Sequence, residues 1–582
     1  MKFRLTALTV ALVMANIACA ATEIDLRRQS VSYIENKLSM QTHNSIVKIE
    51  KMRTDTDFNG ATHTRIRQFY NGIPVWDATG VIHTPRNNKI RKNMLVNIDV
   101  NTTMNGVIYE NIEKDLIGTP AAALTSSAAS KALEAAKNWH ARKSRLTVDS
   151  FKNGKSLPII FIDDNKQAHH AYLTSFTYAT ASAMHRPTSI VDAVTHHVYR
   201  SWEGIFTAHV QEEEAINTAR AKVKKMLNND DPAQPGLYDI AAGGIGGNPK
   251  SGEVIYDGGQ GNKPALNMKA MDMEVEMIPG NPYKMTFCVL MNDDISVVDT
   301  ATGSEVVIDI CMPNSRLHKG IAWLSMNKNQ TRWDADEMNE GYSPSLDAFY
   351  AAVMVKSLYQ DWFGVPALID EEGKPMKYLM RVHFGRKFDN AFWDGEQMTF
   401  GDGGSMFYPL TSVGVTAHEI SHGFTETHSG IDGSKPQMAA LHESFSDMAA
   451  IAVENYMTGK NGWDIGREIK KDEGALRYLD NPTKDGTSID HMKNFDDTEA
   501  HGGAGVTNKA FYLLATTKGW NTRKAFDVMV KANMHYWTSS MNTFNDAACG
   551  VVSATKDYGY DVADVRIAFA KVGVDTDNCD AK

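Results

Sequence analysis

The stretch V-T-A-H-E-I-S-H at residues 415–422 constrains this chain more than any other segment. His418 and His422 are four residues apart, so on a helix both imidazoles lie on one face and can bind the same metal ion. Glu419 follows the first histidine and can reach the open side of that ion as a general base. This H-E-x-x-H pattern predicts a catalytic zinc site; the alternative is a surface helix with two solvated histidines.

A second acidic segment, L-H-E-S-F-S-D at residues 441–447, supplies a third ligand. Glu443 and Asp447 are four residues apart, which places both carboxylates on one face of a second helix. Catalytic zinc takes three protein ligands and leaves its fourth position to water, so Glu443 can complete the set. Asp447 can accept a hydrogen bond from the outer ring nitrogen of a zinc-binding histidine. The apolar residues around both carboxylates favour a partly buried helix over a solvated acidic face.

Together, the H-E-x-x-H pattern and E-S-F-S-D at residues 443–447 resemble the thermolysin family of zinc endopeptidases. Three further blocks resemble the same family: N-A-F-W-D-G at 390–395, A-L-R-Y-L-D-N-P at 475–482 and H-G-G-A-G-V-T-N-K-A-F-Y-L-L-A at 501–515. The resemblance covers the chain from the signal peptide to the last cysteine, and it is closest to the elastase (pseudolysin) and vibriolysin branch that Gram-negative bacteria secrete. It implies an α+β fold with a β-rich N-terminal half, a mainly helical C-terminal half and a zinc helix between them, preceded by an α+β propeptide.

Residues 1–20 have the features of a signal peptide. Lys2 and Arg4 precede an apolar run that is too short for a membrane anchor, and A-C-A at residues 18–20 offers a cleavage pattern of small residues. A linker-like segment lies around residues 228–247, where the resemblance places maturation. The expected parts are therefore a signal peptide (1–20), a propeptide (21–239), a β-rich catalytic domain (240–412), a central zinc helix (413–427) and a helical domain (428–582).

The charge and hydropathy of the chain limit its partners. A net charge of −10 argues against binding nucleic acid, and no segment after the signal peptide is apolar enough to span a bilayer. Both features suit a secreted, extracellular protein exported through the periplasm, and we expect a monomer. Its expected partners are protein and peptide substrates and its own propeptide, which the resemblance implies is an inhibitor and an intramolecular chaperone.

The cysteines also agree with export. Removing Cys19 with the signal peptide leaves Cys288, Cys311, Cys549 and Cys579, which allow three pairings. The short loops favour Cys288–Cys311 and Cys549–Cys579, as in the elastase branch that the chain resembles. A zinc site made of all four cysteines is disfavoured because no C-x-x-C pair is present.

The predicted zinc ligands and their neighbours imply a reaction. Zinc held by His418, His422 and Glu443 lowers the pKa of a water molecule and polarises a peptide carbonyl. Glu419 can take the proton of that water and deliver it to the leaving amine. His501, in what we expect to be a glycine-rich turn opening a helix, matches the family histidine that donates to the negatively charged oxygen of the transition state.

The resemblance also implies a substrate cleft. Asn390 and Ala391 match the edge strand that holds the substrate backbone by strand addition. Arg477 matches the arginine that binds the substrate carbonyl beyond the scissile bond. Val415 and Leu476 match an apolar pocket for a large side chain after that bond, and such pockets discriminate modestly, so we expect broad endopeptidase activity.

Two positions near the predicted site depart from the family pattern. The family usually has a tyrosine, a further donor to the transition-state oxygen, eleven residues after the second zinc histidine, where this chain has Gly433. The loop 430–437 is also one residue longer than usual, and His428 is a candidate to replace the tyrosine. The residue before the zinc glutamate, usually asparagine, is His442.

The calcium site of the related enzymes is doubtful here. The branch places an acid four residues before the first zinc histidine, where this chain has Gly414. Ile451 and Gly462 stand where two more acids are usual, and Glu454 is retained. Calcium favours several carboxylate oxygens, so we expect weak calcium binding or none.

These observations predict a secreted, zinc-dependent neutral endopeptidase that prefers a large hydrophobic residue after the scissile bond and is made as an inhibited precursor. The alternative is a catalytically weakened or silent relative that binds peptides in the same cleft, which the missing tyrosine favours. The complete ligand set, Glu419 and His501 favour the enzyme, because a binding module needs no zinc-activated water. A structural zinc protein is disfavoured, since such a site has four protein ligands.

Overall fold

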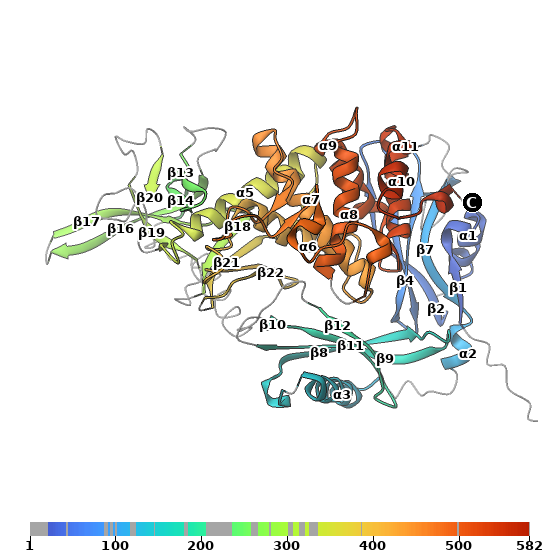
Figure 1. The fold of residues 1–582 in the computed structure, drawn as a ribbon. Helices are drawn as coiled ribbons and strands as arrows, with labels where there is room; N and C mark the ends of the chain where they lie inside the picture. Colours follow the sequence, from blue (N-terminus) through green and yellow to red (C-terminus); the bar gives the residue numbers. More distant parts are fainter. Residues whose placement is uncertain are drawn as a thin grey trace, which may run out of the picture.

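The computed structural model describes residues 21–580 except 42–44, 87–90, 93–96, 99–101, 117–123, 145, 180–183, 205–235, 258–265, 279–280, 301–305, 313–320, 325–335, 386 and 498–499. The predicted signal peptide and the first part of the predicted linker lie outside the described residues. The described chain forms a sheet-rich N-terminal region, a β-rich middle region and a helical C-terminal region (Figure 1).

Residues 22–203 form a ten-stranded sheet in the order β1-β7-β4-β8-β9-β11-β12, with β3 and β2 continuing from β4 and β10 paired with β9. The strands are β1 (Thr22–Asp25), β2 (Val47–Thr56), β3 (Thr62–Tyr70), β4 (Ile73–Thr84), β7 (Thr103–Glu110), β8 (Lys152–Ile162), β9 (Ala168–Ala179), β10 (Met184–His185), β11 (Pro187–Asp192) and β12 (Val198–Glu203), with β5 (Arg91–Lys92) and β6 (Asn97–Ile98) forming a separate pair. The helices are α1 (Val31–Ser39), α2 (Ile112–Leu116) and α3 (Ser126–Ser144). Asn71 and Gly72 have φ values of 50° and 79° between β3 and β4, as an N-G hairpin turn requires.

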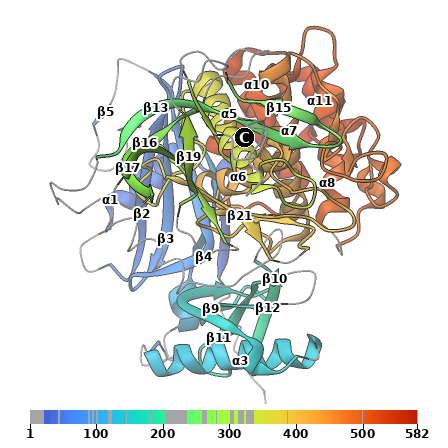
Figure 2. The same ribbon diagram turned by 90° about the vertical axis from the view of Figure 1, so that its left-hand side faces the viewer.

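The two ends of this sheet contact different parts of the chain. Strands β2, β4 and β7 lie beside the C-terminal helices, and Arg65 of β3 and Asn105 of β7 bond to carbonyl groups of residues 534 and 536 (Figure 1). Strands β8, β9, β11 and β12 lie below the centre of the molecule and carry α3 on their outer side (Figure 2). The sheet therefore contacts the later part of the chain in two places: through Arg65 and Asn105 at residues 534 and 536, and through Arg186 at the Asp394 carbonyl.

The described part of the middle region contains a barrel, a four-stranded sheet, a two-stranded sheet and one long helix. A closed barrel is formed by β13 (Tyr238–Gly243), β16 (Leu266–Ile278), β17 (Asn281–Val289), β19 (Ile308–Met312) and β20 (Ala322–Leu324). A four-stranded sheet has the order β18-β21-β23-β22, with β18 (Ile295–Asp299), β21 (Tyr378–Phe384), β22 (Ala391–Trp393) and β23 (Met398–Gly401), and β14 (Ile245–Asn248) pairs with β15 (Gly252–Ile255). Helix α5 (Pro344–Phe363) begins with Pro344, and the Ser343 hydroxyl caps it by accepting a hydrogen bond from the Leu346 amide.

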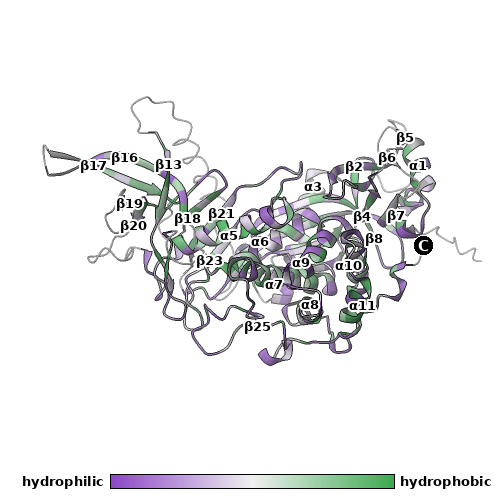
Figure 3. Ribbon diagram, turned by 90° about the horizontal axis from the view of Figure 1, so that it is seen from above, coloured by the Kyte–Doolittle hydropathy of each residue, from purple (hydrophilic) through white to green (hydrophobic). Residues whose placement is uncertain are grey.

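The C-terminal region is helical. It consists of α6 (Val413–His428), α7 (Pro436–Thr458), α8 (Ala500–Ala515), α9 (Thr522–Lys531), the π-helix η7 (Ala532–Tyr536), α10 (Phe544–Tyr558) and α11 (Val562–Ala570), with a short pair of strands, β24 (Asp464–Ile465) and β25 (Arg477–Tyr478). Helix α7 packs between α6 and α8, and one apolar core extends from the barrel through α5 and α6 into these helices (Figure 3). The predicted β-rich and helical halves with a zinc helix between them are therefore confirmed.

Two covalent links and one helix boundary complete the comparison with the sequence. Disulfides join Cys288 to Cys311 and Cys549 to Cys579, the pairing that we expected.

The predicted turn at His501 is wrong, because α8 already begins at Ala500 and its glycines are helical. A Cβ at Gly505 would lie 2.1 Å from the Ile489 carbonyl oxygen, so these glycines permit close packing instead of a turn. Within the described residues, no helix is long and apolar enough to cross a bilayer.

Candidate metal centre

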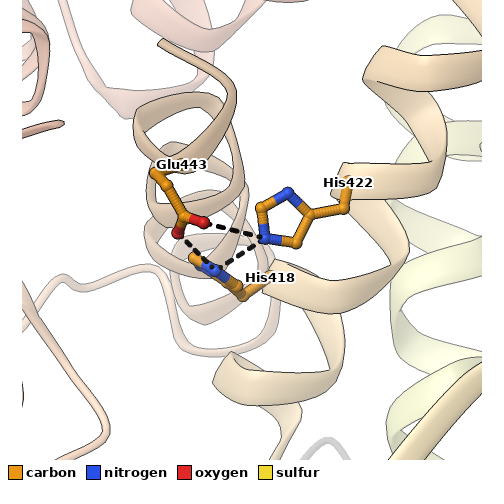
Figure 4. A group of neighbouring side chains, drawn as sticks. All are labelled: His418, His422 and Glu443. Carbon is orange, nitrogen blue, oxygen red and sulfur yellow. Dashed lines mark hydrogen bonds and ion pairs between the residues drawn. The ribbon is translucent and has the colours of Figure 1, made fainter. Parts of the chain in front are cut away.

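Helix α6 presents the two histidines of the H-E-x-x-H pattern to α7. The Ser412 hydroxyl caps the helix by accepting a hydrogen bond from the Val415 amide at 3.3 Å. One helical turn separates His418 from His422, and the side chains are 5% and 0% exposed. Glu443 approaches both from α7 and is fully buried (Figure 4).

The ligand atoms of these three residues converge. The Nε2 atoms of His418 and His422 are 3.0 Å apart, and the Glu443 carboxylate lies 3.2 Å and 3.7 Å from them (Figure 4). All three donor atoms fit within 4.8 Å of one another. Neither Glu443 oxygen makes a well-formed hydrogen bond within the described part of the chain, although both are buried. Two imidazoles and a buried carboxylate are a ligand set that suits catalytic zinc, which takes three protein ligands.

The outer nitrogen of His418 has the partner that the sequence predicts. Its Nδ1 lies 2.9 Å from Asp447 Oδ1. Arg477 donates to both oxygens of the Asp447 carboxylate at 2.7 and 2.8 Å, and Asn508 donates to it at 2.9 Å. Burial alone would raise the pKa of Asp447, but Arg477 and then His418 outweigh burial. The pKa is lowered overall, so the carboxylate stays charged. Asn508 was missed, although it lies two helical turns after His501 on one face of α8.

Glu419 and His501 lie beside the ligand triad. Glu419 is 3% exposed, and one of its oxygens, Oε2, has no hydrogen-bond partner among the described residues. Burial is the largest influence on this group and raises the pKa of Glu419 to about 7. His501 Nε2 lies 3.3 Å from the Glu443 carboxylate, and its side chain is one-third exposed. A buried carboxyl group near neutral pKa and an accessible imidazole thus flank the same triad.

Of the predicted substrate residues, two lie at an edge strand and two lie in or against the main apolar core. Asn390 precedes β22, which is an edge strand of the four-stranded sheet and begins at Ala391. The Trp393 indole donates to Glu426 at 2.7 Å, which ties this edge to α6. Val415, on α6 itself, is buried in the main apolar core, and the half-buried Leu476 packs against the same core. 

The loop that lacks the family tyrosine connects α6 to α7. Gly433 lies in it, and Lys435 pairs with Asp77 of β4 at 2.9 Å, so the loop contacts the N-terminal sheet. His428 does not replace the tyrosine. Its ring is buried at the last turn of α6, stacked on Phe424 at 4.0 Å, and its Nδ1 donates to the Phe424 carbonyl. The structure therefore does not bring His428 to the ligand triad.

Family models match three parts of the chain. Residues 279–426 match the catalytic domain of thermolysin metallopeptidases, and residues 435–574 match the alpha-helical domain of the same group. Residues 48–92 match the fungalysin/thermolysin propeptide motif. The resemblance seen in the motifs thus extends to the catalytic region and to the sheet that precedes it.

Curated relatives match nearly the whole chain. A zinc metalloproteinase of Legionella pneumophila is 36% identical, with 98% of each chain covered. A neutral protease of Vibrio proteolyticus is 34% identical and a hemagglutinin/proteinase of Vibrio cholerae is 33% identical, each match covering 89% of this chain and 71% of the relative. The buried His-His-Glu triad and these matches lead to one conclusion: the chain belongs to the thermolysin family of zinc metallopeptidases, as an endopeptidase that carries its own propeptide motif.

Proposed function

We propose that His418, His422 and Glu443 hold the catalytic zinc and that Glu419 is the general base of peptide hydrolysis. The observation that carries this assignment is the buried Glu419 side chain, whose Oε2 has no hydrogen-bond partner among the described residues, on the helix that presents both histidines. A carboxylate held there can accept a proton from water and return it in the next step. Zinc bound there supplies Lewis acidity, which polarises the scissile carbonyl and acidifies water.

The other polar residues act on the substrate. Glu419 accepts a proton from the attacking water and delivers it to the amine that leaves when the C–N bond breaks. His501, accessible at the edge of the triad, donates to the oxygen on which negative charge develops. Arg477 bonds to Asp447 through Nε and Nη2, so Nη1 can donate to a substrate carbonyl.

The edge strand and the apolar core define the preferred peptide. An extended substrate adds to β22 through backbone hydrogen bonds, with Asn390 and Ala391 at its start. Val415 and Leu476 contribute to a pocket for a large hydrophobic side chain after the scissile bond. The residues that bound this cleft come from both catalytic halves, which we place at 240–412 and 428–582 around the zinc helix 413–427.

The enzyme is made as an inhibited precursor. Support comes from the way residues 21–239 are held against the cleft: Arg186 donates to the Asp394 carbonyl at 2.7 Å, directly after β22. Arg53 donates to the Thr427 carbonyl at 3.0 Å, at the end of the zinc helix. The propeptide thus touches both the substrate edge and the metal helix. We further propose that residues 1–20 direct export and that the processed enzyme is a secreted monomer.

Cleavage of a quenched peptide with leucine or phenylalanine after the scissile bond tests this function. The processed wild type should cleave it, a zinc chelator should stop cleavage, and Glu419→Gln should be inactive while still binding zinc. Replacing the large residue by glycine should lower kcat/KM by about tenfold or more. A wild type that binds zinc but cleaves no peptide would instead support the silent peptide-binding relative and would point to the loop at Gly433.

A further inference from the structure

The second zinc histidine has an unusual partner. His442 directly precedes Glu443 on α7 and is 1% exposed. Its ring stacks on the His422 ring with centroids 4.8 Å apart and planes 27° apart. The two Nδ1 atoms are 2.7 Å apart, which is hydrogen-bond distance. The two ligand histidines therefore have different outer partners: a carboxylate for His418 and an imidazole for His422.

Only one arrangement of protons lets His422 bind a metal. Its Nε2 faces His418 and Glu443, so a metal bound there requires the Nε2 lone pair and leaves the proton on Nδ1. The Nδ1 atom of His442 must then accept that proton's hydrogen bond, which puts the proton of His442 on Nε2. In the reverse arrangement His442 donates, His422 carries its proton on Nε2, and that nitrogen cannot bind metal.

We propose that His442 is a positioning residue whose neutral imidazole accepts the Nδ1 proton of His422 and holds that ring in its metal-binding tautomer. The inference rests on the proposed ligand set. A hydrogen bond to the outer nitrogen of a ligand fixes the ring orientation and raises its basicity. Because the acceptor is neutral, it does so without adding another buried negative charge beside those of Asp447 and Glu443.

This role differs from simple packing in what each substitution should do. Phenylalanine fills the space of the ring but removes the acceptor, so the buried Nδ1–H group of His422 loses its partner. Asparagine is smaller but keeps an acceptor oxygen. If His442 only fills space, His442→Phe is the milder change; if it accepts the proton, His442→Asn is milder.

Zinc affinity, measured by chelator competition on the full-length chain carrying Glu419→Gln, tests the role without relying on activity. We expect His442→Phe to weaken zinc binding by about 10- to 100-fold and His442→Asn to stay within about threefold of the parent. His422→Ala is the control for the ligand set and should lose zinc almost completely. If it retains zinc, the proposed ligands are wrong; if it loses zinc while His442→Phe binds like the parent, only the role of His442 is wrong.

The tautomer can be observed directly if the phenylalanine variant does not fold. In the zinc-loaded parent chain with nitrogen-15-labelled histidine, long-range proton–nitrogen spectra should show a neutral His442 ring protonated at Nε2, assigned by the signal missing from His442→Asn. Protonation of His442 at Nδ1 in the zinc-loaded protein would overturn the proposal.

Discussion

At the scale of single residues, Asp447 has the most demanding environment in the centre. It is fully buried, charged, and bonded to a zinc ligand, to Arg477 and to Asn508. Asp447→Asn keeps the volume but replaces one acceptor by a donor facing these groups. We expect zinc affinity or kcat/KM to fall by about 10- to 100-fold, measured on the processed enzyme. The exposed Asp472→Asn serves as control and should change neither, and wild-type values for Asp447→Asn would contradict the role.

At this scale, the residues that could be predicted from spacing alone are those on one face of a single helix. The intervals His418–His422 and Glu443–Asp447 each correspond to about one turn, so each pair shares a face. The meeting of the two pairs, like the roles of His501 and Arg477, followed from the family resemblance instead. The partnership of His442 with His422 follows from neither, because it joins two helices in a register that only their packing determines. 

At the scale of elements, the segment after α7 bears on calcium. Glu454 accepts a hydrogen bond from the Gly462 amide, and its pKa is raised by burial and by the nearby carboxylates of Asp464 and Glu468. Arg467 already pairs with Asp464 through Nε and Nη2. A guanidinium group therefore neutralises one of the three acids gathered there, Glu454, Asp464 and Glu468, and weak calcium binding stays a prediction.

Removing calcium should accordingly leave the melting temperature of the Glu419→Gln chain nearly unchanged, with zinc kept saturating. A bound ion would stabilise the folded state by mass action, so a large drop in melting temperature would refute the prediction. Arg467→Gln is the matched variant: it frees the Asp464 carboxylate and should make the melting temperature more sensitive to calcium.

Element boundaries were predictable where a side chain marks them and failed where packing decides. Ser343 and Pro344 mark the start of α5, because the serine side chain caps the helix and the proline ring fixes its own φ at a helical value. The predicted turn at the start of α8 was wrong because glycines in a sequence suggest a turn. In this structure Gly505 instead lets the Ile489 backbone pack closely against the helix. The barrel pairs β13 with β20 in parallel across many residues, and no local pattern specifies such a pairing.

At the scale of the whole molecule, a buried cluster joins the propeptide to the catalytic half. His63 of β3 stacks on His535 of η7 with centroids 4.0 Å apart, and its Nδ1 lies 2.8 Å from Nδ1 of His83 of β4. Asp57 accepts from Lys531 at 2.5 Å, and both side chains are 3% exposed. These partners are far apart in the sequence, and no periodicity relates them, so this docking could not be predicted from the sequence.

This cluster makes the binding of the propeptide to the catalytic half sensitive to acid. Burial, followed by His63, lowers the pKa of His83 to about 3, and burial also lowers the pKa of His535 well below its ordinary range. The nearby cations Arg65 and Lys531 act in the same direction. Both rings are neutral while docked and regain a pKa of about 6.5 after separation. The separated parts bind more protons below that pH, so docking weakens as pH falls from about 6.5 towards 3.

Of the other groups near this interface, Asp57 adds to that effect and Asp432 partly offsets it. Burial would raise the pKa of Asp57, but its partners His63 and Lys531 outweigh burial and lower that pKa, which adds loss of docking below about pH 4. Burial, and then Asp77, raises the pKa of Asp432 to about 6, which favours docking between about pH 6 and 4. Tyr536 and Asp557 also face the cluster, and the raised pKa of Tyr536 keeps it neutral in this range.

The dissociation constant of the propeptide can be measured on the full-length Glu419→Gln chain after an added protease has cut the boundary. Between pH 7.5 and 5.5 we expect it to rise by about tenfold for each of the two histidines whose pKa is lowered. His83→Asn and His535→Asn should each remove about tenfold of that rise, because each deletes one proton acceptor. His197→Asn, an exposed propeptide histidine, should keep the full rise. If the constant is the same at both pH values, or if His83→Asn keeps the full rise, proton uptake by this cluster does not control release, and the propeptide is held by contacts indifferent to acid.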